Sequence, residues 1–404
     1  MISLGKGYSG LSYPLIERHL AYLNRRLTPR ISSQGSVGAS GDLAPLAELA
    51  LTFIAEGSFL GDSSESVSAK ALYKKYNWKP LSIGPKEGLA LTNGTQASLA
   101  MACEVRRSLS ELLPWMELTM SLSVEAHRAT ASVFQAKLHR LKAHRHQQEV
   151  AARLSRNLRK SEHMKAHRDC DLVQDAYSFR CMPQILGPCY SLLEKADELL
   201  EGEINSVSDN PIVFFEEKEI LSCGHFHAQS VSFAADLLAM AMVTMGNLIE
   251  RRMDQMVNPA SSRHPAFLAD RPGVESGLMI VQTAAAALAS ENKGLAFPAS
   301  ADTIPTNGNQ EDHVSMAPWA ARKASQIADN LWKLVAAELI CSVRASVLES
   351  TKSGLRFSPT LEAYLKMLAD LRPELFWAGD RNFGEDWRVL CEKMKEQSLE
   401  EVLK

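Results

Sequence analysis

The organisation of this chain centres on Gly35-Ser36-Val37-Gly38-Ala39-Ser40-Gly41-Asp42-Leu43-Ala44-Pro45-Leu46-Ala47, a small glycine-rich loop followed directly by an apolar stretch. Asp42 is a favourable helix N-cap residue, and Pro45 is tolerated in the first turn of a helix. The apolar positions that follow at helical spacing are Leu43, Leu46, Ala47 and Ala50. The simplest interpretation is a tight turn into a helix, and Ala-Ser-Gly alone supports nothing more.

The same loop also has the composition to react with itself. If the loop is bent hard enough, the backbone nitrogen of Gly41 can reach the carbonyl carbon of Ala39, because Gly41 has no side chain in the way. Ring closure and dehydration of Ser40 would leave a 4-methylidene-imidazol-5-one, an electrophile built from the chain. A helix N-terminus would stabilise the negative charge that develops when a nucleophile adds, and Asp42 is placed to assist proton transfers.

Four further stretches accompany this loop in a fixed order: KEGLALTNGT at 86–95, VQDAYSFRC at 173–181, SDNP at 208–211 and NQEDHVSM at 309–316. With the loop, they resemble the aromatic amino acid ammonia-lyases, which form the imidazolone from Ala-Ser-Gly. The resemblance runs from about Leu4 to the C-terminal region. It implies an all-α, long-helix bundle with an autocatalytic prosthetic group from Ala39-Ser40-Gly41 and no external cofactor.

The resemblance assigns roles to residues in the first two of these stretches and to Phe226. Arg180 matches the family residue that clamps the substrate carboxylate, a task suited to a bidentate guanidinium. Asn93 would bind the imidazolone oxygen or the substrate amine, although capping of a helix is the structural alternative. Gln174 and Tyr177 match positions that line the prosthetic group, or form an ordinary helix face. Phe226 would pack against the substrate ring.

The fourth stretch bears on the substrate. Its Gln-Glu-Asp-His wording resembles the histidine-specific members of the family, and a carboxylate at Glu311 suits the N–H of a substrate imidazole. Asn309 and Gln310 would contribute to the same substrate site, and Met279 stands where phenylalanine lyases tend to carry lysine. Alternatively, the acidic residues merely complement the dipole of the helix that follows.

The resemblance therefore implies a carbon–nitrogen lyase that eliminates ammonia from L-histidine to give urocanate. Whether the electrophile engages the amine or the ring of the substrate is left open. The alternatives are a phenylalanine or tyrosine ammonia-lyase or aminomutase, and an inactive fragment or one subunit of a split lyase. Residues 1–404 are expected to form one ammonia-lyase-like helical unit, with the prosthetic group carried by 1–200 and the central bundle and tail by 201–404.

The first ten residues resemble an interior stretch of the family pattern. A typical ammonia-lyase carries a further segment ahead of this point, which supplies the tyrosine proposed as catalytic base. The expected alternatives are a truncated chain, a wrongly assigned start codon, or one half of a split enzyme that has a separate N-terminal fragment as its partner. Tyr177 or Glu311 would replace that base only poorly. Because family sites combine residues from several subunits, we also expect a homotetramer.

Composition bears on the binding partners and the cellular compartment expected of this protein. The chain of 404 residues is 46% hydrophobic and 23% charged, with a formal net charge of −3, which gives no reason to expect nucleic-acid or membrane binding. Seven cysteines without CxxC spacing suit reduced thiols in the cytoplasm. The first thirty residues are amphipathic and charged, unlike a secretory signal. The most apolar run, 231–249, contains Asp236 and is predicted to be a buried helix.

Apolar periodicity predicts helices throughout most of the chain. We expect the break at Pro114 to end one helix, the segment 57–80 to be irregular, and 212–222 to form the one hairpin. The expected helices span residues 15–27, 42–56, 90–113, 118–158, 184–200, 228–256, 277–297 and 313–348.

Histidines form two local groups that invite a metal interpretation. His225 and His227 alternate as in a strand, but no third ligand lies nearby in the sequence, so we expect no metal and a structural role for His227. His139, His144 and His146 lie among basic residues. A solvated basic face, with a role at a subunit contact, is the preferred interpretation.

Overall fold

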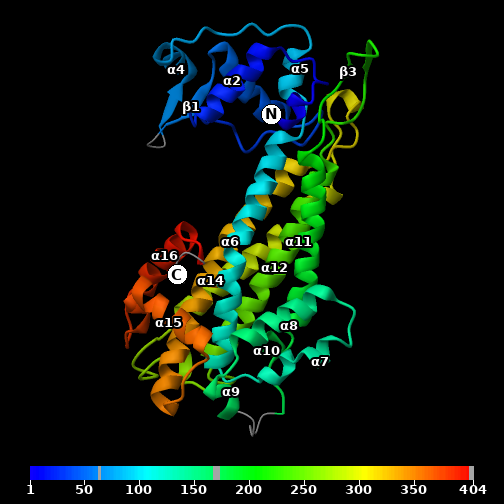
Figure 1. The fold of residues 1–404 in the computed structure, drawn as a ribbon. Helices are drawn as coiled ribbons and strands as arrows, with labels where there is room; N and C mark the ends of the chain where they lie inside the picture. The colour runs from blue at the N-terminus through cyan, green and yellow to red at the C-terminus, as the bar shows by residue number, and fades with distance from the viewer. Residues whose placement is uncertain (62–64, 167–172, 400–404) are drawn as a thin grey trace. The chain divides into compact units, whose positions relative to one another are not determined.

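The computed structural model describes residues 1–61, 65–166 and 173–399, and the chain divides into two compact units. Unit 1 comprises Met1–Val105, Lys195–Leu238 and Pro298–Ser325, and unit 2 comprises Arg106–Glu194, Ala239–Phe297 and Gln326–Lys404. Each unit is thus assembled from three separate segments of the chain, coloured in Figure 1 by residue number. The expectation of a single ammonia-lyase-like unit divided at residue 200 stays a prediction.

Long helices dominate the secondary structure, so the predicted all-α class is confirmed (Figure 1). Of these helices, α6, α11, α12 and α14 contribute residues to both units. The bounds of the longest helices are α6 (Gln96–Ala126), α11 (Met182–Ile204), α12 (Gln229–Val257), α13 (Met279–Leu295) and α14 (Ala317–Ser353).

Helix α12 is the only helix of the described residues that is long and apolar enough to cross a membrane, and 72% of its apolar window is buried inside the structure. Such burial is typical of a core helix, as expected for the run 231–249.

The expected break at Pro114 is wrong. Helix α6 passes through this proline without interruption and ends only at Ala126. A proline inside a helix costs about 3 kcal/mol. Leu112, Trp115 and Met116 around it are fully buried, and burial of large apolar side chains contributes roughly 1.5–3 kcal/mol each, which offsets that cost. The expected continuous helix over 118–158 is also wrong, because the chain turns at Arg128 with a φ of 58°.

Unit 1 contains a core of buried apolar and aromatic residues: Leu15, Tyr22, Phe53, Phe59, Ala69, Leu72 and Leu91. The Tyr22 hydroxyl donates to the Thr52 carbonyl at 3.0 Å, so the polar tip of this core residue is satisfied. The predicted hairpin within 212–222 is confirmed. A second hairpin lies within the segment 57–80, which was expected to be irregular. The elements confined to unit 1 are α1 (Ile2–Gly5), α2 (Tyr13–Asn24), α3 (Leu43–Leu51), η1 (Thr52–Ile54), β1 (Ser58–Leu60), β2 (Ser66–Ser68), α4 (Ala69–Lys75), α5 (Glu87–Thr92), β3 (Ile212–Phe214), β4 (Glu219–Leu221), η4 (Ala299–Ala301) and η5 (Asn307–Asn309).

Both hairpins are antiparallel and short, with Phe59 opposite Val67 in one and Val213 opposite Ile220 in the other.

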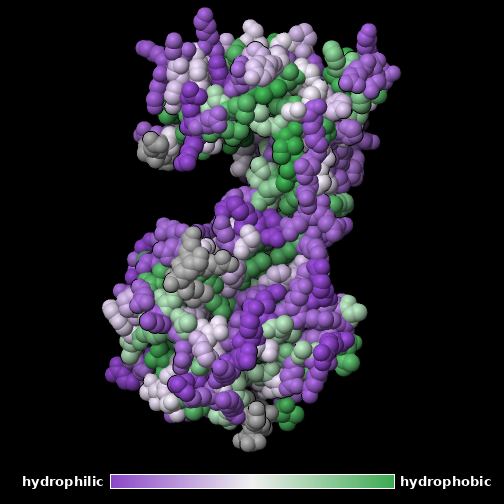
Figure 2. Space-filling view, in the orientation of Figure 1, coloured by the Kyte–Doolittle hydropathy of each residue, from purple (hydrophilic) through white to green (hydrophobic). Residues whose placement is uncertain are grey.

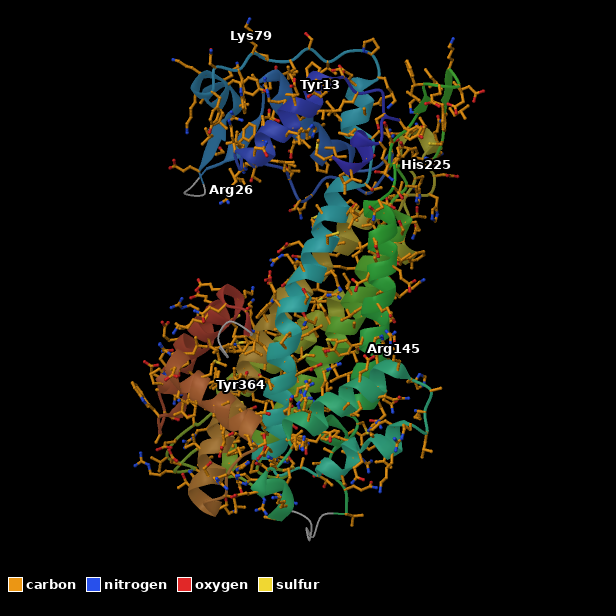
Figure 3. The ribbon with its side chains drawn as sticks, in the orientation of Figure 1. Tyr13, Arg26, Lys79, Arg145, His225 and Tyr364 are labelled. Carbon is orange, nitrogen blue, oxygen red and sulfur yellow. The ribbon has the colours of Figure 1, made fainter. Side chains whose placement is uncertain are left out.

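Unit 2 packs shorter helices against the long ones. Tyr364 on α15, labelled in Figure 3, is fully buried, and its hydroxyl lies 3.2 Å from that of Thr119 on α6. The elements confined to unit 2 are η2 (Ala131–Phe134), α7 (Ala136–His139), α8 (Arg145–Asn157), α9 (Glu162–Ala166), α10 (Tyr177–Arg180), η3 (Ala266–Leu268), α13, α15 (Pro359–Leu371), η6 (Pro373–Phe376) and α16 (Phe383–Glu396). Figure 2 shows hydrophilic and hydrophobic residues interspersed over the visible face of each unit.

A buried carboxyl in unit 2 makes stability depend on pH. Burial raises the pKa of Glu125 to about 7, although the Ser358 backbone N–H donates to its Oε1 at 2.8 Å. Between the ordinary value of 4.5 and about 7, the folded state holds a proton that the unfolded chain has lost. The free energy of unfolding therefore falls as pH rises through this window and is flat above it.

We expect Glu125 to remove about 3 kcal/mol of stability between about pH 4.5 and pH 7, at roughly 1.4 kcal/mol per pKa unit. Glu125→Gln keeps the shape of the neutral carboxyl and should abolish this part of the pH dependence. Urea unfolding of both chains at mildly acidic and mildly alkaline pH measures the difference. Equal pH dependence in the two chains would contradict the assignment.

Candidate active site in the loop before helix α3

The glycine-rich loop is held in a bent conformation by backbone contacts within unit 1. Ser40 has a φ of 52°, which a non-glycine residue rarely adopts, and the flanking Gly38 and Gly41 have φ values of 82° and 81°. The Met316 backbone N–H donates to the Val37 carbonyl at 2.9 Å. The loop therefore stores backbone strain at the serine that the sequence marks as reactive.

Two glycines of the loop are required by close approach of other segments. A Cβ on Gly41 would lie 2.6 Å from the Gly94 nitrogen and closer still to the Gly94 carbonyl oxygen. A Cβ on Gly38 would collide with the Ser315 hydroxyl. Ala39 and Ser40 thus lie between two glycines. Gly41 packs against the stretch 86–95, and Gly38 packs against the stretch 309–316.

Asp42 is completely buried behind the loop, and the expectation that its side chain caps helix α3 is wrong. Its Oδ2 instead accepts hydrogen bonds from the Ser98 backbone N–H at 2.7 Å and the Ser98 hydroxyl at 2.9 Å. Burial raises the pKa of Asp42, and the bonds from Ser98 oppose that shift. The Asp42 backbone N–H donates to the Gly94 carbonyl at 2.7 Å, so this residue ties the loop to the start of α6.

Asn93 lies directly before the glycine that contacts the loop. It is at the C-terminal end of α5, not at a helix entrance, and it is buried. Its Oδ1 has no hydrogen-bond partner in the described structure. A buried polar atom without a partner is costly, so it marks a place where a further group would bind.

The stretch 208–211 contacts residues on both sides of Gly94 in the sequence. Gln96 Nε2 donates to the Ser208 hydroxyl at 2.8 Å, and Lys86 forms an ion pair of 2.8 Å with the buried Asp209. Four of the five stretches that the sequence singles out thus contact one another inside unit 1.

Glu311 reaches the loop directly. The Ser40 hydroxyl donates a hydrogen bond to Glu311 Oε1. The other oxygen, Oε2, accepts from the Thr306 hydroxyl at 3.0 Å and from the side-chain amide of Asn307. The structure therefore brings together two predicted site residues that lie 271 positions apart.

The other predicted site residues of unit 1 are partly or fully exposed to solvent. Asn309 and Gln310 are exposed, and Phe226 is half-buried. The ring of His227 lies parallel to that of His313, with centroids 6.0 Å apart, and its Nε2 is 3.1 Å from the His313 carbonyl oxygen. His225, labelled in Figure 3, is exposed. Among the described residues no three His, Cys, Asp or Glu side chains gather to hold a metal.

Unit 2 holds the remaining candidates on and around the short helix α10. The Arg180 guanidinium lies over the Tyr177 ring, 4.8 Å from its centroid, so these two predicted residues are brought together. Between them, Phe179 is buried and stacks on His127 at 4.6 Å. The buried Arg252 donates to the Ser178 carbonyl at 3.3 Å. The buried contacts of Ser178 and Phe179 therefore hold this turn in place, whereas the Tyr177 side chain is exposed.

Gln174 and Met279 also belong to unit 2, and both are exposed. Gln174 precedes α10, and Met279 begins α13. None of the described hydrogen bonds connects either side chain to the Tyr177–Arg180 pair.

The basic region 139–146 is only partly a solvated face, which corrects the expectation for His139. His139 is buried, with Nε2 2.9 Å from the Val133 carbonyl and Nδ1 3.0 Å from the Gln147 amide. His146 bonds to Glu149 and Glu194, whereas Arg145 is exposed and pairs with Glu194 (Figure 3). A histidine beside basic residues indicates a surface position in the sequence, but His139 ends α7 and bonds to Val133 of η2 and Gln147 of α8.

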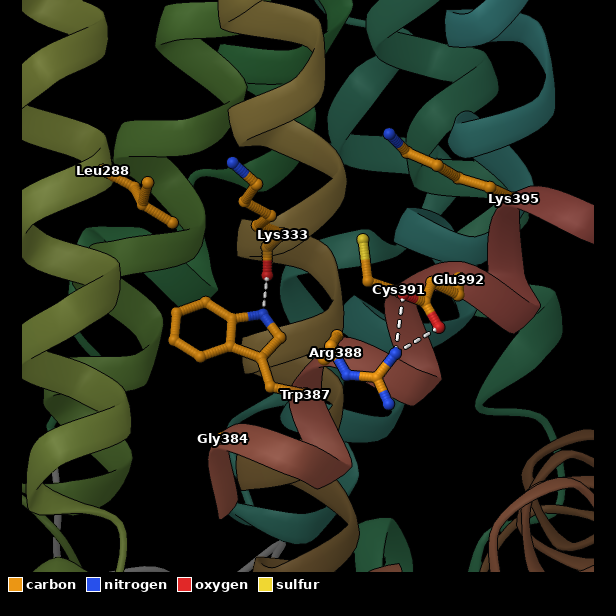
Figure 4. Close-up of a pocket in the computed structure, with 8 residues that line it drawn as sticks. All are labelled: Leu288, Lys333, Gly384, Trp387, Arg388, Cys391, Glu392 and Lys395. Atoms are coloured by element: carbon orange, nitrogen blue, oxygen red, sulfur yellow. Dashed lines mark hydrogen bonds and ion pairs between the residues drawn. The ribbon is translucent and has the colours of Figure 1, made fainter. Parts of the chain in front are cut away.

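A separate pocket of about 390 Å³ lies in unit 2 against α13, α14 and α16 (Figure 4). The Trp387 indole N–H donates to the Lys333 carbonyl at 2.7 Å, and Arg388 pairs with Glu392 at 2.8 Å. Its lining contains none of the residues singled out by the sequence, so the loop before α3 remains the candidate active site.

Several supporting residues were not named from the sequence. They are Ser98, Thr306, Asn307, Ser315 and Arg252. Three of them carried a signal. Ser315 lies within the stretch 309–316, and Thr306 and Asn307 lie within five residues of Glu311, on a turn that brings them back to its carboxylate.

Comparison with known proteins places this geometry in a family. The family model described as aromatic amino acid lyase matches residues 1–370. A histidine ammonia-lyase of Vibrio cholerae is 42% identical over 385 residues, covering 95% of this chain and 74% of the relative. One of Yersinia enterocolitica is 41% identical over 403 residues, covering 99% of this chain and 78% of the relative. The crystal structure of histidine ammonia-lyase from Trypanosoma cruzi superposes with a TM-score of 0.89 at 35% identity, covering 99% of this chain and 75% of that one. This chain belongs to the aromatic amino acid lyase family.

Proposed function

We propose that this protein is an ammonia-lyase that eliminates ammonia from L-histidine to give urocanate. Curated relatives at 41–42% identity are histidine ammonia-lyases, which supports histidine over phenylalanine or tyrosine. The observation that carries the proposal is the loop itself, in which a strained Ser40 lies between two sterically required glycines and bonds to Glu311.

The loop fits the prosthetic group that the family implies. Only glycine fits at position 41, because a Cβ there would collide with the Gly94 backbone, and Asn93, the residue before Gly94, offers an unpartnered buried Oδ1. A 4-methylidene-imidazol-5-one from Ala39-Ser40-Gly41 would supply a strong electrophile that converts a poor leaving group into a good one. Asn93 would bind it, and Asp42 would assist the proton transfers of ring closure.

The remaining candidates form two groups, one in each unit. In unit 2, Arg180 would bind the substrate carboxylate by a bidentate pair, with Gln174, Tyr177 and Met279 as further substrate contacts. In unit 1, the Glu311 carboxylate would accept from the imidazole N–H, with Phe226, Asn309 and Gln310 as further contacts. Because the resemblance implies sites that combine residues from several subunits, the expected homotetramer would bring such groups to one substrate. Tyr177 and Glu311 are poor candidates for the base that removes the β-proton, so we assign that role to neither.

We further propose assembly into a homotetramer in the cytoplasm. Large apolar side chains remain exposed on the long helices: Phe233 and Met240 on α12, Ile280 on α13 and Trp319 on α14. Contacts between subunits would remove such apolar side chains from water.

The intact mass of the purified chain is the first test. We expect a mass lower than that of the sequence by two water molecules, with the whole deficit in the peptide that contains residues 35–47. Ser40→Ala should abolish it. A full mass in the unaltered chain would contradict the proposed electrophile.

Substrate choice is tested next. The chain is assayed with histidine, phenylalanine and tyrosine, both alone and mixed with the N-terminal part of the Vibrio cholerae relative. We expect turnover of histidine only, at least about 100-fold reduced in Glu311→Gln, since a polar group left unpaired in a binding site typically costs a few kcal/mol. Turnover of phenylalanine or tyrosine in preference to histidine would overturn the substrate assignment.

A further inference from the structure

The contact between Ser40 and Glu311 has no explanation in substrate binding. Glu311 was expected to hold an imidazole, yet its Oε1 accepts a hydrogen bond from the Ser40 hydroxyl. This hydroxyl oxygen is the atom that must leave when Ser40 is dehydrated. Glu311 therefore touches a reacting atom of the loop.

We propose that Glu311, once protonated by solvent, is the acid of the second dehydration: along the same contact in which its Oε1 accepts from the Ser40 hydroxyl, the protonated carboxyl donates to Ser40 Oγ as the Cβ–Oγ bond breaks. This inference rests on the proposed function, because it concerns how the electrophile of that function is made. It gives Glu311 a role in building the active site, separate from any role in binding histidine.

The atoms balance in two steps. In ring closure Gly41 N bonds to the Ala39 carbonyl carbon, and one water leaves with the Ala39 oxygen and the protons of the Gly41 and Ser40 nitrogens. In the second step Ser40 Oγ leaves with its own hydrogen and the proton from Glu311. The Cα proton of Ser40 passes to solvent water, the Cα–Cβ double bond forms, and a solvent proton restores Glu311.

The carboxyl group is fixed for this task. Oε2 is held by the Thr306 hydroxyl at 3.0 Å and by the Asn307 amide, and the Thr306 backbone N–H donates to the Glu311 carbonyl at 3.0 Å. Oε1 is left to face Ser40. In the described part of the chain no lysine, arginine or histidine is ion-paired with Glu311.

The other acid near the loop is engaged elsewhere. Asp42 accepts from Ser98 through Oδ2, and its Oδ1 lies 3.5 Å from the Ser36 hydroxyl. Neither of these bonds involves Ser40. The two acids are therefore suited to different steps, with Asp42 at ring closure and Glu311 at loss of the serine hydroxyl.

Intact and peptide masses of Glu311→Gln, Glu311→Asp and Asp312→Asn test this role. Asp312 is the matched control, because it is the adjacent acidic residue and is exposed. We expect Asp312→Asn to lose two waters like the unaltered chain. Glu311→Gln should stall at one water lost, with the fully dehydrated fraction reduced at least about tenfold, since general acids contribute roughly 10²–10⁴-fold to a rate. Glu311→Asp keeps an acid and should recover part of the second loss.

Each other outcome contradicts the proposal. A two-water deficit in Glu311→Gln, reached as fast as in the unaltered chain, overturns the role of Glu311 and leaves the proposed function standing. An unreacted Glu311→Gln chain would mean that Glu311 shapes the loop and does not act as the acid. An unreacted mass in the unaltered chain would overturn both the acid role and the proposed electrophile.

Discussion

Replacing Gly41 with alanine should leave the chain at its full, unreacted mass and abolish histidine turnover. The new Cβ would lie 2.6 Å from the Gly94 nitrogen and closer to the Gly94 carbonyl oxygen, both of which belong to the backbone and cannot rotate away. Alanine would also be strained at a φ of 81°. The loop would have to move, which would separate the Gly41 nitrogen from the Ala39 carbonyl carbon.

Gly35→Ala is the matched control for this substitution. Gly35 lies in the same loop with a φ of 108°, but a Cβ there meets no atom within 4 Å. It should cost about 1 kcal/mol of stability through backbone strain alone and keep the two-water deficit. Peptide mass and a thermal melt of both variants separate the two effects. A dehydrated Gly41→Ala chain would show that close packing against Gly94 is not needed for ring closure.

The second large effect is expected from the buried ion pair of unit 2. Arg252 and Glu338 are both inaccessible to solvent, and the guanidinium forms two hydrogen bonds to the carboxylate, at 2.6 and 2.9 Å. Arg252→Met removes the cation and leaves the Glu338 charge buried. Such a loss typically costs about 3–5 kcal/mol, so we expect urea unfolding to move to much lower concentrations.

Arg252→Met with Glu338→Leu is the control for that experiment. Removing both charges should restore most of the lost stability, because a well-packed apolar pair often replaces a buried ion pair without loss. Arg252 also donates to the Ser178 carbonyl in the turn that bears Arg180. The double variant should therefore fold, yet show a higher KM for histidine than the unaltered chain. A single variant that loses less than about 1 kcal/mol would contradict this account of the pair.

Much of this architecture could be read from the sequence, and the failures have physical causes. Apolar periodicity located α12, α13 and α14, because each buries a face over many turns. It failed at Pro114, where the burial of Trp115 and Met116 outweighs the tendency of proline to interrupt a helix. It also missed β1 and β2, because their sequences, Ser-Phe-Leu and Ser-Val-Ser, hold fewer β-branched and aromatic residues than the Ile-Val-Phe of the predicted hairpin.

The candidate site shows the same division between local and long-range information. The Ala-Ser-Gly chemistry is local, so the reactive residues could be named from the sequence. The partners of Asp42 are not, since Ser98 lies 56 positions away, and a buried acid before a helix looks the same as a cap. The bond between Ser40 and Glu311 depends on folding of segments that no spacing rule connects.

This separation along the chain would set the timing of the proposed maturation. Ser40 leaves the ribosome early, but Glu311, the proposed acid, and the Met316 N–H that holds Val37 are made roughly 280 residues later. At about 5–20 residues per second, that interval is roughly 15–55 s. A nascent chain would thus carry an ordinary, unreactive serine during synthesis. Cellular thiols and amines would meet the electrophile only after it is enclosed in a folded protein.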